Sequence, residues 1–132
     1  MCKLLIVEND KSWSRFLVNR LSAKDVEIVC AFDGKEAVDR LNSNDIDFAI
    51  IDVVVPKISG VGITELIRKK KLKTKVAFII STYEEGDKIS DFLIFMSKDK
   101  RQPGKQVFFK NGNFNDSDII NKCKSFIQES VL

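Results

Sequence analysis

The sequence predicts an α/β domain built on a doubly wound parallel sheet of five strands in the order 2-1-3-4-5. One pattern in the sequence and one rule of chain topology lead to this prediction. Short apolar runs alternate along the chain with segments in which apolar residues recur at helical spacing, and this alternation is typical of βαβ units. Right-handed crossovers between such units give a parallel sheet with helices on both faces, and 2-1-3-4-5 is one of its two common strand orders.

The first half of the chain supplies three of the strands. Lys3–Val7, Val26–Ala31 and Asp47–Ile51 are short runs rich in apolar and β-branched residues, as expected for buried strands. Asp10 or Ser12 can cap the helix that follows the first strand. Helices are expected where apolar residues share one side: Trp13, Phe16, Leu17 and Leu21; Ala37, Val38 and Leu41; Ile63, Leu66 and Ile67.

The second half continues the same alternation. Val76–Ile80 predicts a fourth strand and Val107–Phe109 a short fifth strand, while Ile119–Val131 predicts the last helix. Lys98–Lys105 is expected to be the one long, mobile loop. A fourth helix is indicated by Ile89, Phe92, Leu93 and Met96. Phe92, Phe95 and Phe108 in the fourth helix and fifth strand could form a dimer surface, although phenylalanines at such spacings are more often core residues.

Length and composition narrow the possible classes of protein. The 132 residues fit one domain, residues 1–132, and the net charge of +3 is too small to imply nucleic acid as a direct partner. No apolar run approaches the ~20 residues of a membrane span. The N-terminus lacks the basic-then-apolar pattern of a secretion signal. We therefore expect a protein that contacts neither nucleic acid nor membrane directly.

Cysteine and histidine usage add two further limits. Cys2, Cys30 and Cys123 are scattered and show no CxxC spacing, which indicates reduced thiols in a cytoplasmic protein. The chain contains no histidine. This excludes histidine-based nucleophilic catalysis, histidine-ligated zinc and a phosphohistidine acceptor within the chain.

Polar residues stand where four of the predicted strands end. Glu8 and Asn9 follow the first strand, Asp52 the third, Ser81 the fourth and Lys110 the fifth. Ligands of open α/β sheets bind beyond the carboxyl ends of the strands, at the point where the strand order reverses. In the predicted order the first and third strands are neighbours. Glu8, Asn9 and Asp52 are therefore expected to converge at one crevice.

These residue types suit phosphoryl transfer. Carboxylates gathered at one place repel each other, and a divalent cation with few hard oxygen ligands, Mg²⁺ in particular, relieves the repulsion. Ser81 can donate a hydrogen bond to a phosphoryl oxygen and Lys110 can supply a positive charge. Because phosphoryl transfer needs mainly positioning and charge neutralisation, the set predicts a carboxylate that accepts phosphate.

The chain resembles the receiver domain of two-component response regulators over essentially its whole length. The residues that carry the resemblance are the stretch Ala31–Val38, the strand Asp47–Asp52, and the spacing from Asp52 to Pro56 and Gly60. The resemblance implies a flavodoxin-like (α/β)5 receiver fold. It also implies a signalling module rather than an enzyme.

The resemblance further implies roles for particular residues. Asp52 is then the phosphoacceptor, supplied by a sensor histidine kinase or a phosphotransfer protein. Glu8, Asn9 and Asp52 with the Val54 carbonyl surround Mg²⁺, and Ser81 and Lys110 contact the phosphoryl group. The phosphorylated form presents a changed face, near the fourth helix and fifth strand, to a downstream protein or output domain.

Three positions depart from the family pattern. Asn9 stands where an acid is usual, so metal affinity should fall, and Asn9 could equally be a turn residue. Asn111 stands where the family places a proline after Lys110, and Val107 where an aromatic switch residue is common. These departures support an alternative: a degenerate receiver-like interaction module that works without phosphorylation. A flavin-binding protein or an enzyme on the same sheet lacks support, because no phosphate-binding loop follows the first strand.

Overall fold

The computed structural model describes residues 2–43, 45–52, 60–70, 72–81, 106–110 and 116–131. Within these residues a parallel sheet runs in the order β2-β1-β3-β4-β5, which confirms the predicted fold class and strand order. The strands are β1 (Cys2–Val7), β2 (Val26–Ala31), β3 (Phe48–Asp52), β4 (Lys75–Ser81) and β5 (Gln106–Lys110). The helices are α1 (Lys11–Leu21), α2 (Gly34–Ser43), α3 (Gly60–Lys69) and α5 (Asp116–Val131).

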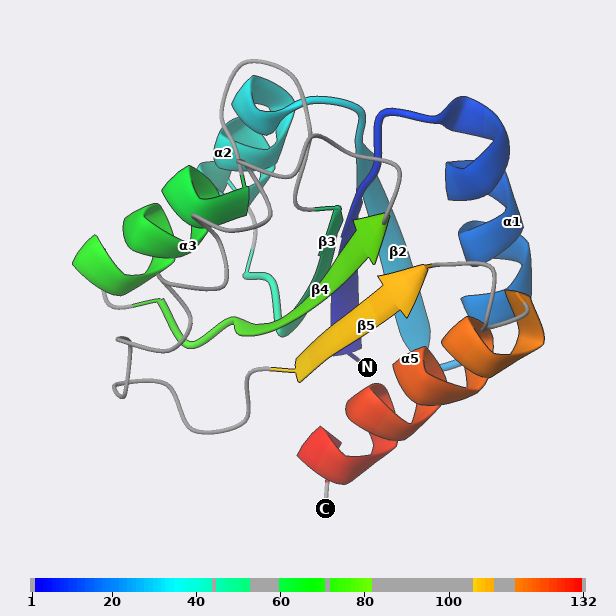
Figure 1. The fold of residues 1–132 in the computed structure, drawn as a ribbon. Coiled ribbons are helices and arrows are strands. Elements are labelled where there is room, and N and C mark those ends of the chain that lie inside the picture. The colour runs from blue at the N-terminus through cyan, green and yellow to red at the C-terminus, as the bar shows by residue number, and fades with distance from the viewer. Residues whose placement is uncertain are drawn as a thin grey trace.

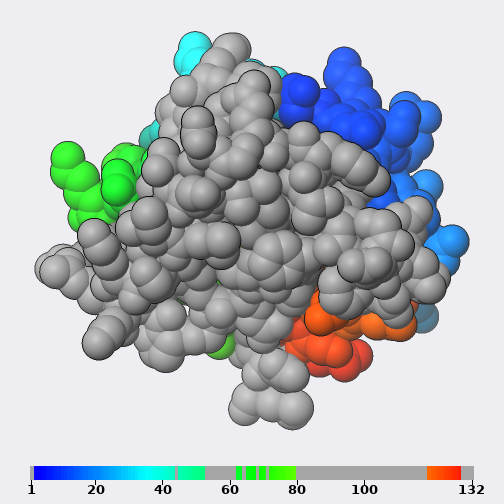
Figure 2. Space-filling view, in the orientation of Figure 1, coloured from blue at the N-terminus to red at the C-terminus, as the bar shows by residue number. Residues whose placement is uncertain are grey.

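Helices cover both faces of the sheet. Figure 1 shows α2 and α3 on one side of the strands and α1 and α5 on the other. In the same orientation, Figure 2 shows the atoms of α1 and α3 at opposite flanks of the molecule. This is the three-layer arrangement that right-handed crossovers in a parallel sheet produce.

Two apolar layers hold the helices to the sheet. The α2 and α3 side packs Leu5, Val7, Ala49, Ile51 and Phe78 against Ala37, Leu41, Ile63 and Ile67. The α1 and α5 side packs Leu4, Ile6, Phe48, Ile50 and Ile79 against Trp13, Leu17, Leu21, Ile120, Cys123 and Phe126. Alternate residues of each strand thus enter opposite layers, and the central strands read as continuous apolar runs because both of their faces are buried.

Polar caps fix where the first two helices begin. The Asp10 carboxylate accepts hydrogen bonds from the backbone N–H groups of Ser12 and Trp13, so the predicted cap at Asp10 is confirmed. At the start of α2, Asp33 Oδ1 accepts from the Glu36 N–H at 2.8 Å. Each cap satisfies amide groups that the first turn of a helix leaves without an intrahelical partner.

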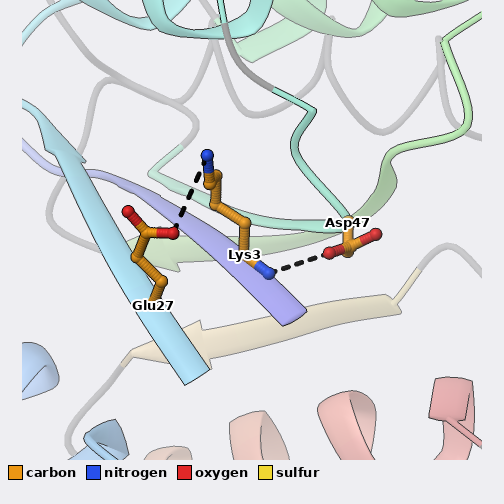
Figure 3. A network of polar contacts seen from close by, with 3 residues as sticks. All are labelled: Lys3, Glu27 and Asp47. Carbon is orange, nitrogen blue, oxygen red and sulfur yellow. Dashed lines mark hydrogen bonds and ion pairs between the residues drawn. The ribbon is translucent and has the colours of Figure 1, made fainter. Parts of the chain in front are cut away.

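A polar network ties the strands together at the start of the sheet (Figure 3). The Lys3 backbone N–H donates to Asp47 Oδ2 at 2.8 Å, and the Lys3 ammonium lies 3.7 Å from Glu27 Oε2. The Asp47 backbone also donates to the Lys3 carbonyl and accepts from the Lys75 N–H. Residues in β1, β2 and β4 and the residue before β3 therefore meet at the amino-terminal ends of the strands. The predicted site lies at their carboxyl ends.

Several predicted boundaries differ from the structure. The first strand begins one residue earlier than predicted, and β4 and β5 each extend one residue further at both ends. The third strand begins at Phe48 and includes Asp52, because Asp47 takes part in the polar network beside the strand start rather than in the strand itself. The last helix begins at Asp116 rather than Ile119, since polar residues suit the first turn, where amide groups are not yet paired within the helix. The predicted fourth helix and the loop Lys98–Lys105 lie outside the described residues. No helix in the described part of the chain could cross a membrane.

Candidate functional site

The register between β1 and β3 places two acidic residues side by side. Val7 pairs with Ile51. Glu8 directly follows Val7 in the sequence, and Asp52 directly follows Ile51. Both are buried, with 3% of Glu8 and 9% of Asp52 exposed. The structure thus brings these two predicted site residues to the same level of two neighbouring strands, at the carboxyl edge of the sheet.

The strand alternation indicates which layer Asp52 joins. Phe48 and Ile50 lie in the apolar layer under α1 and α5, and Asp52 is two residues further along β3. Because side chains two residues apart in a strand share a face, Asp52 stands on the α1 side of the sheet. The turn that leads into α1, which contains Asn9 and Asp10, follows β1 at this edge.

Hydrogen bonds hold Glu8 from two directions. Its backbone N–H donates to the Ala31 carbonyl at 3.0 Å. Its carboxylate Oε1 accepts from the Asp10 N–H at 3.1 Å. The carboxylate is therefore oriented by the turn between β1 and α1.

Asn9 links two turns of the chain. Its side-chain Nδ2 donates to the Phe32 carbonyl at 3.1 Å, and the Phe32 N–H donates to Glu36 Oε2 at 2.8 Å. The Lys11 ammonium lies 5.6 Å from the centre of the Phe32 ring, within cation–π range. A structural role for Asn9 in the turn is thus observed, and the same bond directs Oδ1, its acceptor atom, away from Phe32.

The Phe32–Glu36 contact was not predicted from the sequence. Its signal was present, because Asp33 followed three residues later by Glu36 resembles a capping box. The register of β1 against β2 then brings this capped turn beside Asn9, with Val7 opposite Ala31. Only the strand pairing reveals that the turn after β2 supports the turn after β1.

Asp10 caps the helix that follows it. Its Oδ1 accepts the Ser12 and Trp13 amide bonds at 3.0 and 3.2 Å. Among the residues that the structure describes, no three histidine, cysteine or acidic side chains form a cluster suited to a metal ion. The donors gathered at this edge are two buried carboxylates and one side-chain amide.

The remaining predicted positions follow from backbone register. Ser81 pairs with Lys110 at the ends of β4 and β5. Asp52 pairs with Ile79, so Ser81 lies two residues further along the strand beside β3. Both residues therefore stand at the carboxyl edge that carries Glu8 and Asp52. Val54 and Asn111 lie outside the described residues, whereas Val107 is in β5 opposite Phe78.

Comparisons with known proteins identify the family of the chain. Residues 4–97 match the model of the family described as "Response regulator receiver domain". The chain is 28% identical over 87 residues to the alkaline phosphatase synthesis transcriptional regulatory protein PhoP of Bacillus subtilis, covering 66% of this chain and 36% of that protein. It is 28% identical over 138 residues to the response regulator ArlR of Staphylococcus epidermidis, covering 91% of this chain and 63% of that protein.

Solved structures resemble the chain over nearly its full length. The response regulator TrrA of Thermotoga maritima, in complex with Mg²⁺-BeF, is 25% identical with a TM-score of 0.69, and the match covers 96% of this chain and 99% of that one. A two-component transcriptional regulator from Clostridium phytofermentans is 19% identical with a TM-score of 0.73, covering 99% and 96%. The chain spans only 36% to 40% of the first curated relatives.

Proposed function

The chain belongs to the response regulator receiver domain family, and on that premise we propose that it is a switch controlled by phosphorylation of Asp52. The observation that carries the proposal is the pairing of Val7 with Ile51, which puts buried Glu8 and Asp52 at adjacent strand ends. A sensor histidine kinase or a phosphotransfer protein supplies the phosphoryl group.

The donor set at this edge fits Mg²⁺. The carboxylates of Glu8 and Asp52 and the Oδ1 atom of Asn9 are hard oxygen donors, and Mg²⁺ prefers few such ligands completed by water. The Val54 carbonyl is the fourth proposed ligand. When bound, Mg²⁺ supplies positive charge beside Asp52. With two carboxylates instead of three, we expect weaker binding than an all-acid set would give.

The other residues of the edge position the phosphoryl group. Ser81 and Lys110, paired at the ends of β4 and β5, donate a hydrogen bond and a positive charge to its oxygens. The Asn9 and Glu36 bonds to Phe32 keep the turns beside Glu8 in place. Charge neutralisation and positioning together are what phosphoryl transfer requires.

The relatives support a signalling role with a downstream partner. PhoP and ArlR are named as a transcriptional regulatory protein and a response regulator, and both are longer than this chain. We propose that the phosphorylated face engages a downstream protein or output domain, in the cytoplasm.

A thermal unfolding experiment tests the proposal. We expect Mg²⁺ with beryllofluoride to raise the unfolding temperature of the wild type, because a ligand that binds only the folded state at 100 times its Kd adds about 2.7 kcal/mol. Asp52→Asn should abolish the rise. Asp39→Asn, an exposed position in α2, removes the same charge away from the site and should leave the rise intact.

The same experiment separates the proposal from its alternative. If the wild type shows no rise, or if Asp52→Asn shows the same rise, the chain is a receiver-like interaction module that works without phosphate. Incubation with a partner kinase gives an independent reading, since the intact mass of the wild type should increase by one phosphoryl group and that of Asp52→Asn should not.

A further inference from the structure

A cavity lies at the opposite end of the sheet from the carboxylates. It has a volume of about 650 Å³ and is open to solvent. It is formed by the end of α1, the turn after it, the starts of β1 and β2, and the second half of α5, and Figure 1 shows α1 and α5 on the same side of the sheet. Its lining includes Cys2, Arg20, Leu21, Ser22, Ala23, Asp25, Val26, Lys124, Ile127 and Gln128. Cavities of ~300–1,000 Å³ are typical of small-molecule sites.

One part of the lining is apolar. Leu21 and Ile127 are buried members of the layer under α1 and α5, with 4% and 9% of their surface exposed. Val26 is half-buried beside them. Burial, with a smaller contribution from the carboxylates of Asp47 and Asp25, raises the pKa of the Cys2 thiol. The thiol is therefore neutral at pH 7 and adds to the apolar part of the wall.

The rim of the cavity is charged and its charges do not cancel. Arg20 and Lys124 each contribute a positive charge and Asp25 contributes one negative charge, so these three leave one positive charge in excess. The Arg20 guanidinium lies 5.1 Å from the centre of the Phe16 ring. This stacking restricts the side chain before any ligand arrives, which lowers the entropic cost of binding.

We propose that this cavity binds a small amphipathic monoanion. The apolar body of the ligand rests against Leu21, Val26 and Ile127. Its carboxylate or sulfonate head pairs with Arg20 and Lys124, and a guanidinium suits such a planar or forked group because it can donate two parallel hydrogen bonds. The excess positive charge at the rim favours one negative charge in the ligand. This site uses none of the residues proposed for phosphorylation.

The fluorescent probe anilinonaphthalene sulfonate tests the proposal on the folded chain. We expect saturable binding, with changes in backbone amide NMR shifts concentrated at residues 20–26 and 124–128. Lys124→Gln and Arg20→Gln should each weaken binding by about 1.5- to fivefold, the range for exposed charge pairs. Lys122→Gln removes the same charge from an exposed position of α5 outside the lining and should bind as the wild type does.

A neutral analogue separates the two parts of the proposed ligand. Phenylnaphthylamine keeps the apolar body without the sulfonate and should bind the wild type more weakly than the sulfonate does, and Arg20→Gln should leave the affinity for this neutral analogue unchanged. The proposal is overturned if the shift changes spread over other faces of the protein, or if the probe does not bind. It is equally overturned if Lys124→Gln and Arg20→Gln match Lys122→Gln, because the anion would then not be recognised.

Discussion

At the scale of single residues, Asn9 shows how one side chain can serve both the fold and the site. Its Nδ2 atom donates to the Phe32 carbonyl, which a carboxylate could not do. Its Oδ1 atom remains suited to a metal that accepts oxygen ligands. Because position 9 holds asparagine instead of an acid, the site has one negative charge fewer near Glu8. In its place the chain has a hydrogen bond between two turns.

Asn9→Asp should reverse that exchange. The carboxylate cannot donate to the Phe32 carbonyl, so we expect the free energy of unfolding without metal to fall by about 1 kcal/mol. The added charge should increase the affinity for Mg²⁺. Urea unfolding and a Mg²⁺ titration measure the two effects. Asn19→Asp, an exposed position in α1, is the matched control, and equal stability of Asn9→Asp and the wild type would show that the Phe32 bond contributes nothing.

Cys123 gives a prediction about pH. Burial raises the pKa of this thiol to about 12 from an ordinary value of 9.0. The folded state thus keeps a proton that the unfolded state loses above pH 9. The contribution of the Cys123 thiol to the free energy of unfolding is fully present below pH 9. It is lost as the pH rises from about 9 toward 12, at up to about 1.4 kcal/mol per pH unit.

Chemical denaturation at pH 8 and pH 10 tests this linkage. The wild type should lose about 1 kcal/mol more stability over that interval than Cys123→Ala, because only the wild type carries the titrating Cys123 thiol. Tyrosine and lysine titrate in both proteins and cancel in the comparison. Equal losses would mean that the Cys123 thiol is accessible to water in the folded state.

At the scale of elements, we expect the Asp47 carboxylate to stabilise the strand starts more than the ion pair between Lys3 and Glu27 does. The Asp47 side chain accepts a charge-assisted bond from the Lys3 backbone, and its own backbone joins β1 to β4. The ion pair between Lys3 and Glu27 spans 3.7 Å, and 54% of the Glu27 side chain is exposed. Water and salt screen such a pair strongly.

Two alanine variants separate these contributions. Asp47→Ala removes the acceptor for the Lys3 amide and should lower the free energy of unfolding by about 1 kcal/mol. Glu27→Ala should change it by less than about 0.5 kcal/mol. Urea unfolding at low salt measures both. A larger loss for Glu27→Ala would show that the surface ion pair, rather than the backbone bond, holds the strand starts together.

At the scale of the whole molecule, the sequence predicts layers well and contacts between turns poorly. The apolar runs and helical spacings identify the elements, and the crossover rule gives the strand order, which puts Glu8 beside Asp52. Nothing in the periodicity shows that Asn9 reaches Phe32, because that contact depends on the register of β1 with β2. The cavity could not be predicted from the sequence for the same reason, since Leu21, Val26 and Ile127 come from three separate elements.

The two proposed sites lie at opposite ends of β1. Cys2, its first residue, lines the cavity, and Glu8 directly follows its last residue. Six strand residues at ~3.3 Å each span about 20 Å, whereas direct coupling is usual only within ~7–10 Å. The two ligands should therefore stabilise the fold independently.

Thermal unfolding with both ligands tests this independence. The stabilisation by anilinonaphthalene sulfonate together with Mg²⁺ and beryllofluoride should equal the sum of the separate effects to within about 0.5 kcal/mol. A larger combined effect would mean that each ligand raises the affinity for the other. Helix α1 starts close to Glu8 and ends at the cavity, so a shift of α1 would be the first explanation to test for such coupling. Arg20→Gln should then reduce the combined stabilisation to the sum of the two separate effects.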